Sequence, residues 1–240
     1  MTDIKVFTET FNRIAQSKSD TEVFDDFLDI SICALSGQQY EEEYLAIIKK
    51  YGKEQVNLHC ELFAHMVAIM DADGQGFTDC LGEFFQSHIT HGRHGQFFTP
   101  SHVTDFMAQI TMDETTAGKT IMDPACGSGR MLLSAAKVNR HNHFFGADID
   151  HRCVKMATVN LCLNGITGEV AWMNSLSFEH WGGYSIKYRQ HAHLHFPVII
   201  KLPPNEGIIY NNCLNRAEEE QPPSRQTNLI TVTQTKLNLE

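Results

Sequence analysis

The segment at residues 120–137 constrains the fold of this chain more than any other. It begins with a short apolar run that ends in Asp123, continues through a turn that contains Gly127 and Gly129, and then reads as the start of a helix. Glycine lets the backbone come close to a ligand, and a helix N-terminus adds a partial positive charge beside it. A strand, a glycine-rich turn and a helix in this order predict a cradle for a nucleotide-like ligand in an α/β fold.

The spacing within this turn indicates which kind of ligand it holds. The turn follows neither the G-x-G-x-x-G pattern of dinucleotide sites nor the G-x-x-x-x-G-K-[ST] pattern of P-loops, and no Lys follows Gly129. It therefore does not predict a phosphate site. A carboxylate at the end of the strand, followed by such a turn, suits a zwitterionic ligand with an amino group, such as S-adenosylmethionine.

The periodicity of apolar residues changes near residue 95. Before it, apolar residues recur at three- and four-residue spacing, which is typical of helices. Beyond Pro100, short β runs alternate with helices, which predicts an α/β fold with a mainly parallel sheet. We therefore expect a helical N-terminal domain at residues 1–95 and a ligand-binding α/β domain at residues 96–240. The expected helices are 3–18, 21–35, 39–51, 54–70, 78–90, 101–112, 128–138 and 151–164, and the expected strands are 120–123, 143–148, 169–173 and 197–201.

The composition argues against a membrane-spanning or secreted protein. No run of about 18 apolar residues occurs, and no basic stretch followed by an apolar one opens the chain. Seven cysteines without paired spacing are typical of reduced thiols, so we expect a cytoplasmic protein without membrane partners. The net charge is −10, of which residues 1–95 carry −9 (16 acidic against 7 basic) and the rest −1 (13 against 12). We expect such a chain to bind a nucleic acid backbone poorly by itself.

Two patterns resemble metal sites. Residues 71–76 read D-A-D-G-Q-G, like the start of a calcium loop, but Gly82 occupies the position of the bidentate Glu. His191, His193 and His195 would share one face of an extended strand, although no second ligand cluster is near them in the sequence. We expect a structural turn in the first case, a surface strand in the second, and no metal.

Five motifs occur in the order and at about the spacing of one known family. They are G-Q-F-F-T-P at 95–100, D-P-A-C-G-S-G at 123–129, F-F-G-A-D-I-D at 144–150, N-S-L at 174–176 and F-P-V-I-I-K-L-P-P-N at 196–205. Together they resemble the modification subunits of type I restriction–modification systems, which are adenine-specific (N6) DNA methyltransferases, over about residues 79–205. The resemblance implies a Rossmann-like methyltransferase fold, S-adenosylmethionine as cofactor, DNA as a partner, and further specificity or methylase subunits.

The resemblance also implies which residues bind the cofactor. They are Phe98, Thr99, Pro100 and Asp123 near its amino acid end, the backbone of Ala125, Gly127 and Gly129 along it, Asp148 at the ribose hydroxyls, and Asn174 and Leu176 beside the adenine ring. Asn174 stands where the family usually has Asp.

The catalytic motif of the family is altered in this chain. In the family, an N-P-P-[FY] segment accepts hydrogen bonds from the adenine amine and stacks on the flipped base; the aligned residues here are Leu202, Pro203, Pro204 and Asn205. We therefore expect impaired or partner-dependent methyl transfer, weak DNA binding by this chain alone, and a C-terminally shortened methyltransferase domain. The alternative is a non-catalytic, cofactor-binding pseudo-methyltransferase or remnant that acts as an interaction module.

Overall fold

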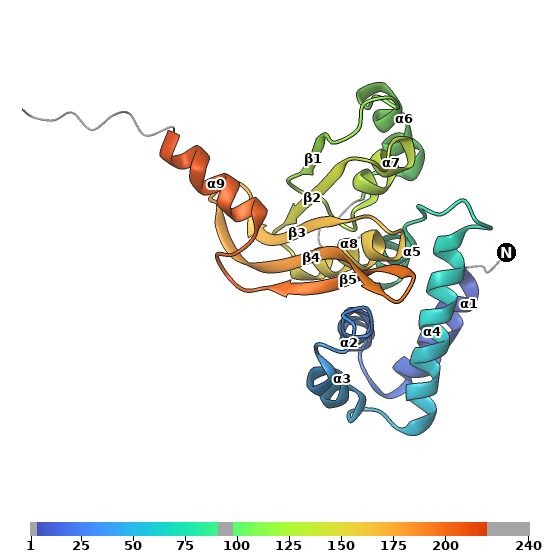
Figure 1. Ribbon diagram of the computed structural model, residues 1–240. Helices are drawn as coiled ribbons and strands as arrows, with labels where there is room; N and C mark the ends of the chain where they lie inside the picture. Colours follow the sequence, from blue (N-terminus) through green and yellow to red (C-terminus); the bar gives the residue numbers. More distant parts are fainter. Residues whose placement is uncertain (1–3, 91–97, 220–240) are drawn as a thin grey trace, which may run out of the picture.

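The computed structural model describes residues 4–90 and 98–219 of the chain (Figure 1). In chain order the elements are α1 (Ile4–Ile14), the 3-10 helix η1 (Ala15–Ser17), α2 (Asp20–Ala34), α3 (Glu41–Ile48), α4 (Lys53–Asp71), α5 (Cys80–Phe84), the π-helix η2 (Phe85–Ile89), α6 (Ser101–Thr111), β1 (Thr120–Asp123), α7 (Arg130–Val138), β2 (His143–Asp148), α8 (His151–Leu163), β3 (Gly168–Asn174), β4 (Glu179–His191), β5 (Leu194–Leu202) and α9 (Ile208–Glu219). Capping side chains explain several helix starts: Ser19 accepts from the amide of Glu22 before α2, and Asp150 accepts from the amide of Arg152 before α8. The predicted helices are confirmed to within a few residues at each end.

The strands form one mixed sheet in the order β1-β2-β3-β4-β5 (Figure 1). The pairs β1–β2 and β2–β3 are parallel, and the pairs β3–β4 and β4–β5 are antiparallel. The predicted α/β class is confirmed, with the crossovers through α7 and α8 that are typical of a Rossmann-like half. The sheet is parallel only in that half, because β5 follows β3 through the antiparallel strand β4 instead of through a crossover helix.

Strand β4 has no counterpart among the expected elements. It contains Gly182 and Gly183, and such a pair normally weakens a strand. In the sheet these glycines fit a close backbone approach: a Cβ on Gly183 would lie 2.5 Å from the carbonyl oxygen of Val170, and Gly182 has a φ of +135°. A register shift between Trp172 and Met173 lies opposite them. The hairpin of β4 and β5 therefore extends the sheet beyond β3.

Helices cover the two faces of the sheet in different ways. On one face α8 packs on β2 and β3, where Phe144 and Val170 are buried, and α2 packs on α8. On the other face α9 packs Ile209 against Ala171. The main hydrophobic core combines side chains from α1, α2, α4 and α5 with side chains from β2, β3, α7 and α8. The N-terminal helices thus share a core with the sheet. The boundary expected at residue 95 lies outside the described residues, and the division into two domains stays a prediction.

The two metal-like patterns adopt ordinary local structures. Residues 71–76 form the predicted turn between α4 and α5, closed by a 2.9 Å hydrogen bond from a glycine amide to the first aspartate. The surface strand expected around the histidines is a surface hairpin: His191 ends β4, His193 lies in the hairpin turn, and His195 belongs to β5. Within residues 4–90 and 98–219, no three His, Cys, Asp or Glu side chains gather as a metal site requires. No helix in those ranges is long and apolar enough to cross a membrane.

Candidate functional site

The glycine-rich turn lies at the carboxyl end of β1 and leads directly into α7. Two carboxylates hold its backbone. The amide of Gly127 donates to Oδ2 of Asp148 at 2.8 Å, which links the turn to the end of β2. The amide of Ala125 donates to Oδ1 of Asp123 at 3.1 Å. The acids predicted to contact the cofactor therefore also fix the shape of the turn.

Both glycines predicted to line the cofactor have a left-handed backbone and close neighbours. Gly127 has a φ of +54°, and a Cβ there would lie 2.9 Å from the ring of Phe98. Gly129 has a φ of +85°, and a Cβ there would lie 3.2 Å from the Cα of Ala157 in α8. Other residues rarely adopt this conformation. These contacts explain locally why the turn needs glycine at both positions.

The segment before α6 reaches the turn through one arginine. Nη1 of Arg130 donates to the carbonyl of Thr99 at 3.0 Å, and its guanidinium carbon lies 6.0 Å from the centre of the Phe98 ring. Pro100 follows as the N-cap of α6. The structure thus brings Phe98 and Thr99, about 30 positions earlier in the chain, to the glycine-rich turn.

A buried carboxylate that the sequence reading did not assign to the site anchors the turn. Asp79 is 7% exposed, and its carboxylate caps α5 by accepting from the amide of Gly82 at 2.8 Å. It also accepts a short hydrogen bond from the Ser128 hydroxyl, one of 2.9 Å from Nε of Arg130, and one of 2.7 Å from Nδ2 of Asn160. One side chain therefore joins the helical N-terminal part, the turn and α8.

The end of β3 closes the site on its other side. The hydroxyl of Ser175 donates to the carbonyl of Pro124 at 2.6 Å, so the segment after β3 lies against the turn after β1. Oδ1 of Asn174 accepts from the amide of Leu176 at 3.0 Å. The Leu176 side chain is 93% exposed. The residues predicted to border the adenine ring thus lie at the same sheet edge as the turn.

Burial raises the pKa values of the two carboxylates beside the turn. It raises the pKa of Asp123, and the negative charge of Asp148 raises it further. Burial is also the main cause of the raised pKa of Asp148. Carboxylates that are costly to ionise benefit from a cationic or hydrogen-bond-donating ligand. Burial raises the pKa of the Cys126 thiol well above its ordinary value, which disfavours the thiolate that a nucleophile requires.

The altered tetrad lies at the other end of the strand order. Leu202 ends β5, Pro203 and Pro204 follow, and the amide of Asn205 donates to Nδ1 of His180 at 3.0 Å. β5 is four strand positions from β1, which at about 4.8 Å per position is roughly 19 Å. The predicted cofactor residues come together around β1, β2 and β3. β5 is two strand positions from β3, and His180, which holds Asn205, pairs with Met173 next to the predicted residue Asn174. The roles of both groups stay predictions.

The sequence matches the family model described as N-6 DNA Methylase over residues 46–231. The chain belongs to the N-6 DNA methylase family. It is 24% identical over 143 residues to the type I restriction enzyme MpnII methylase subunit of Mycoplasma pneumoniae. The aligned region covers 56% of this chain and 26% of that protein. It is 28% identical over 109 residues to the type I restriction enzyme MjaIX methylase subunit of Methanocaldococcus jannaschii, which covers 42% of this chain and 19% of that one.

These matches confirm the predicted resemblance to type I methylase subunits. This N-6 DNA methylase chain spans about a quarter or less of the length of those two relatives. The solved structure of a type I restriction–modification system methyltransferase subunit from Streptococcus thermophilus matches with a TM-score of 0.35 and 24% identity, over 67% of this chain and 36% of that chain. That likeness is too weak to bear on the fold.

Proposed function

We propose that this chain binds S-adenosylmethionine at the carboxyl ends of β1, β2 and β3 and takes part in N6 methylation of adenine in DNA. Its own activity is impaired or depends on a partner. The observation that carries this proposal is a contrast within one sheet. Two carboxylates, Asp123 and Asp148, flank a glycine-rich turn at adjacent strand ends, whereas the tetrad that ends in Asn205 follows a strand four positions away.

The side chains around the turn fit the cofactor. Asp123 can accept from its ammonium group, and Asp148 from its ribose hydroxyls. Ile149, which is 62% exposed, and Leu176, which is 93% exposed, offer apolar surface to an adenine ring. When bound, S-adenosylmethionine supplies an activated methyl group. The chain's own contribution is to bind and orient it, with Phe98 packed against the turn.

The tetrad supports impaired transfer. The Leu202 side chain has no acceptor for the adenine amine, and Asn205 has no ring on which the base could stack. Loss of one transition-state hydrogen-bond partner costs about 3–4 kcal/mol, and loss of stacking costs roughly 1–3 kcal/mol. Together these losses correspond to about a 10³- to 10⁵-fold slower turnover. Reacting atoms must also approach to about 3–3.5 Å, and three strands separate β5 from β1.

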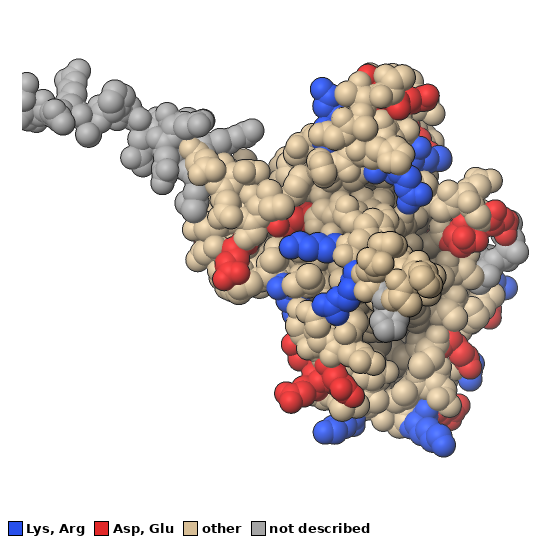
Figure 2. Space-filling view, viewed as in Figure 1, with Lys and Arg blue, Asp and Glu red and all other residues tan. Residues whose placement is uncertain are grey.

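Two features support dependence on a partner. In the described part of the chain β1 pairs only with β2, so its other edge is open to a strand from another polypeptide, beside Asp123. The second feature is charge, since backbone binding to DNA needs clustered Lys and Arg and the chain carries −10. Figure 2 shows Lys and Arg in small separate groups on one face, with Asp and Glu between them. A partner would supply the cationic surface.

A second candidate is a cofactor-binding protein without catalysis, which acts through association. The strand order favours it, because restoring the side chains of the tetrad would not bring β5 next to β1. The two candidates share the cofactor site and differ in what a partner can restore.

A tritiated-methyl transfer assay on unmethylated genomic DNA tests the proposal. The chain is assayed alone, as the Leu202→Asn, Asn205→Tyr double variant, and together with specificity and methylase subunits of a type I system. We expect slow or no incorporation by the chain alone, and incorporation once the partner subunits are present. Robust incorporation by the unmodified chain alone would show that the tetrad is misassigned.

Calorimetry with S-adenosylmethionine runs beside this assay and separates the candidates. Binding without incorporation under any condition identifies the non-catalytic candidate. Absence of binding at about 1 mM ligand, a limit of roughly −4 kcal/mol, refutes the cofactor site itself.

A further inference from the structure

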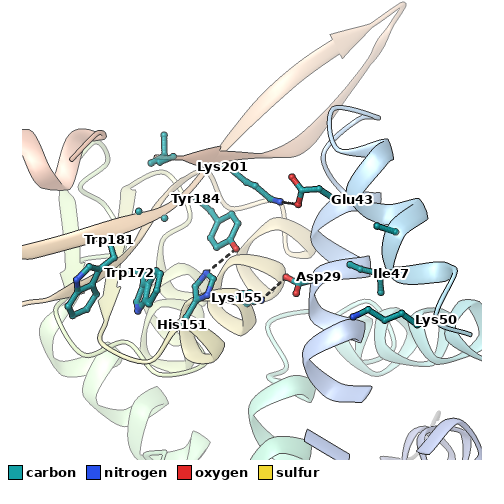
Figure 3. Close-up of a pocket in the computed structure, with 14 residues that line it drawn as sticks. Asp29, Glu43, Ile47, Lys50, His151, Lys155, Trp172, Trp181, Tyr184 and Lys201 are labelled. Atoms are coloured by element: carbon teal, nitrogen blue, oxygen red, sulfur yellow. Dashed lines mark hydrogen bonds and ion pairs between the residues drawn. The ribbon is translucent and has the colours of Figure 1, made fainter. Parts of the chain in front are cut away.

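A cleft of about 600 Å³ lies between the N-terminal helices and the antiparallel half of the sheet (Figure 3). α2 and α3 form one wall, and α8 with strands β3, β4 and β5 forms the other. The cleft is on the α8 face of the sheet, whereas the glycine-rich turn follows β1 at the opposite edge. The side chains that matter below are Asp29, Glu43, His151, Lys155, Trp172, Trp181, Tyr184 and Lys201.

A row of aromatic rings lines the sheet side of this cleft (Figure 3). The rings of His151 and Trp172 are stacked, with centres 4.3 Å apart and planes 16° apart. Tyr184 continues the row at 6.2 Å from His151, with an interplanar angle of 8°. Trp181 extends it at the other end, 5.4 Å from Trp172. Three rings from three elements are thus nearly parallel, and a fourth is tilted against their end.

The polar groups of the cleft leave this row uncharged. Burial lowers the pKa of His151 to about 4, so its ring is neutral at neutral pH. Lys155 pairs with Asp29 at 2.7 Å, and Lys201 pairs closely with Glu43. The cations are therefore held by acids of α2 and α3 at the border of the cleft. A neutral planar ring complements such a surface better than an anion does.

We propose that this cleft binds a nucleobase, stacked on Trp181 at the end of the aromatic row. Aromatic platforms hold bases in this way because every base offers a π-face, and indole rings are large platforms. Ion-paired lysines at the border can still contact a sugar–phosphate. The base can belong to a single-stranded nucleic acid or to a free nucleotide. Leu202, the first residue of the tetrad, also lines the cleft. Base stacking on Trp181 requires neither the cofactor nor methyl transfer, so its test is separate from that of the proposed function.

The chain contains two tryptophans, and both line the cleft, so its intrinsic fluorescence reports on this site. Nε1 of Trp172 also donates to the carbonyl of Ile149 at 3.0 Å, beside the proposed cofactor surface, so the effect of S-adenosylhomocysteine alone is measured as a reference. The intact chain is titrated with adenosine monophosphate, with single-stranded oligo-dA, and with ribose 5-phosphate, which lacks a base. We expect saturable quenching by the first two and none by the third. If the oligonucleotide quenches at a nucleotide concentration at least tenfold lower than adenosine monophosphate does, the base comes from a nucleic acid. Comparable or stronger binding of the monophosphate identifies a free nucleotide.

Variants separate stacking from general effects on the fold. Trp181→Leu should weaken binding about tenfold, which is about 1.4 kcal/mol, whereas Trp181→Phe keeps a ring and should stay within threefold of the unchanged chain. Phe106→Leu is the matched control, because that ring is 61% exposed on α6, outside the cleft. Circular dichroism checks that each variant is folded.

A saturating amount of S-adenosylhomocysteine should leave the affinity for the nucleotide unchanged. Competition by it would overturn the proposal, because the rings would then belong to the cofactor site. Two other results would overturn it as well. One is no saturable quenching up to about 10 mM nucleotide, which means that binding is weaker than about −4 kcal/mol. The other is an unaltered affinity in Trp181→Leu.

Discussion

The turn after β1 matches a family motif and the tetrad after β5 aligns with an altered one, and the structure holds the two segments very differently. Asp79, Asp148 and the carbonyl of Thr99 hold the turn, with Arg130 at its end, from three other segments of the chain. The tetrad follows the outer strand of a hairpin, and the amide of Asn205 donates to a single side chain, that of His180. A motif's place in the chain sets its local conformation. Its place in the sheet depends on strand pairing. Here the pairing leaves three strands between β1, which leads into the glycine-rich turn, and β5, which leads into the tetrad.

The largest expected effect tests how firmly the turn is held. Asp79→Ala removes a carboxylate whose side chain is 4% exposed and leaves Arg130, 14% exposed, without its ion-pair partner. We expect the free energy of unfolding to fall by about 3–5 kcal/mol, measured by urea denaturation. Asp71→Ala is the matched control, since it removes one hydrogen bond in an exposed turn and should cost about 1 kcal/mol. Equal losses in the two variants would show that the network does not anchor the turn.

The second effect concerns ligand affinity at the two regions. Asp148→Ala removes the acceptor for the Gly127 amide as well as the proposed contact to the ribose. Hydrogen bonds to charged groups contribute about 1.5–3 kcal/mol, so S-adenosylmethionine should bind about 10- to 100-fold more weakly. Isothermal titration calorimetry measures this. Leu202→Asn, at the tetrad, should leave the affinity unchanged; if it weakens binding as much as Asp148→Ala, the two regions form one site.

The third effect is a strain at the tetrad. Asn205 has a φ of +63°, a left-handed conformation that Asn tolerates better than most residues. Asn205→Tyr, which restores the aromatic residue of the family, should therefore lower the free energy of unfolding by roughly 1–2 kcal/mol. Asn205→Gly should be as stable as the unchanged chain or slightly more stable. Equal stability of the Tyr and Gly variants would mean that the backbone at 205 is not left-handed in solution.

The smallest effect is a pH dependence at the turn. Because the pKa of Asp123 is raised in the folded chain, its ionisation disfavours folding, and this cost disappears as the pH falls below the ordinary value of 3.8. Asp123→Asn should therefore be more stable than the unchanged chain at pH 7, by less than about 1 kcal/mol, and the difference should fade with acid. Urea denaturation at several pH values measures it.

Asp113→Asn is a control of opposite sign for that measurement. Hydrogen bonds from Thr116 and Thr115 lower the pKa of Asp113 to about 2, so its carboxylate favours folding above pH 3.8 and loses this contribution as the pH falls towards 2. The variant should be less stable than the unchanged chain at pH 7. The same sign for both variants would contradict the assignment of burial as the cause at Asp123.

Local sequence patterns predicted most helices and strands of this fold. Features that depend on pairing between distant segments could not be predicted from these patterns. The expected strand at 120–123 coincides with β1, and the expected helix at 54–70 lies within one residue of α4 at each end. Both are set by periodicity over a few residues. β4 was hidden because Gly182 and Gly183 read as breakers, and their suitability depends on the approach of Val170 from another strand.

In the candidate site, too, the sequence predicted some residues and missed others. The glycine-rich turn and the acid at 148 have sequence signals, since each ends a predicted strand. Asp79 lies within the expected helix at 78–90, and the periodicity that predicts this helix gives no indication of the partners of Asp79. Its role depends on the docking of α5 against α7 and α8, which no local pattern describes.

The contacts of Asp79 also bear on the order in which this chain folds. They close loops of 49, 51 and 81 residues, to Ser128, Arg130 and Asn160. Loops of that length form slowly compared with helices, because chain entropy opposes their closure before the contacts form. The complete set of contacts can form only after synthesis has passed α8 and the N-terminal helices have docked. We therefore expect ligand binding at the glycine-rich turn to appear late in folding, and its appearance after dilution from denaturant would time this docking step.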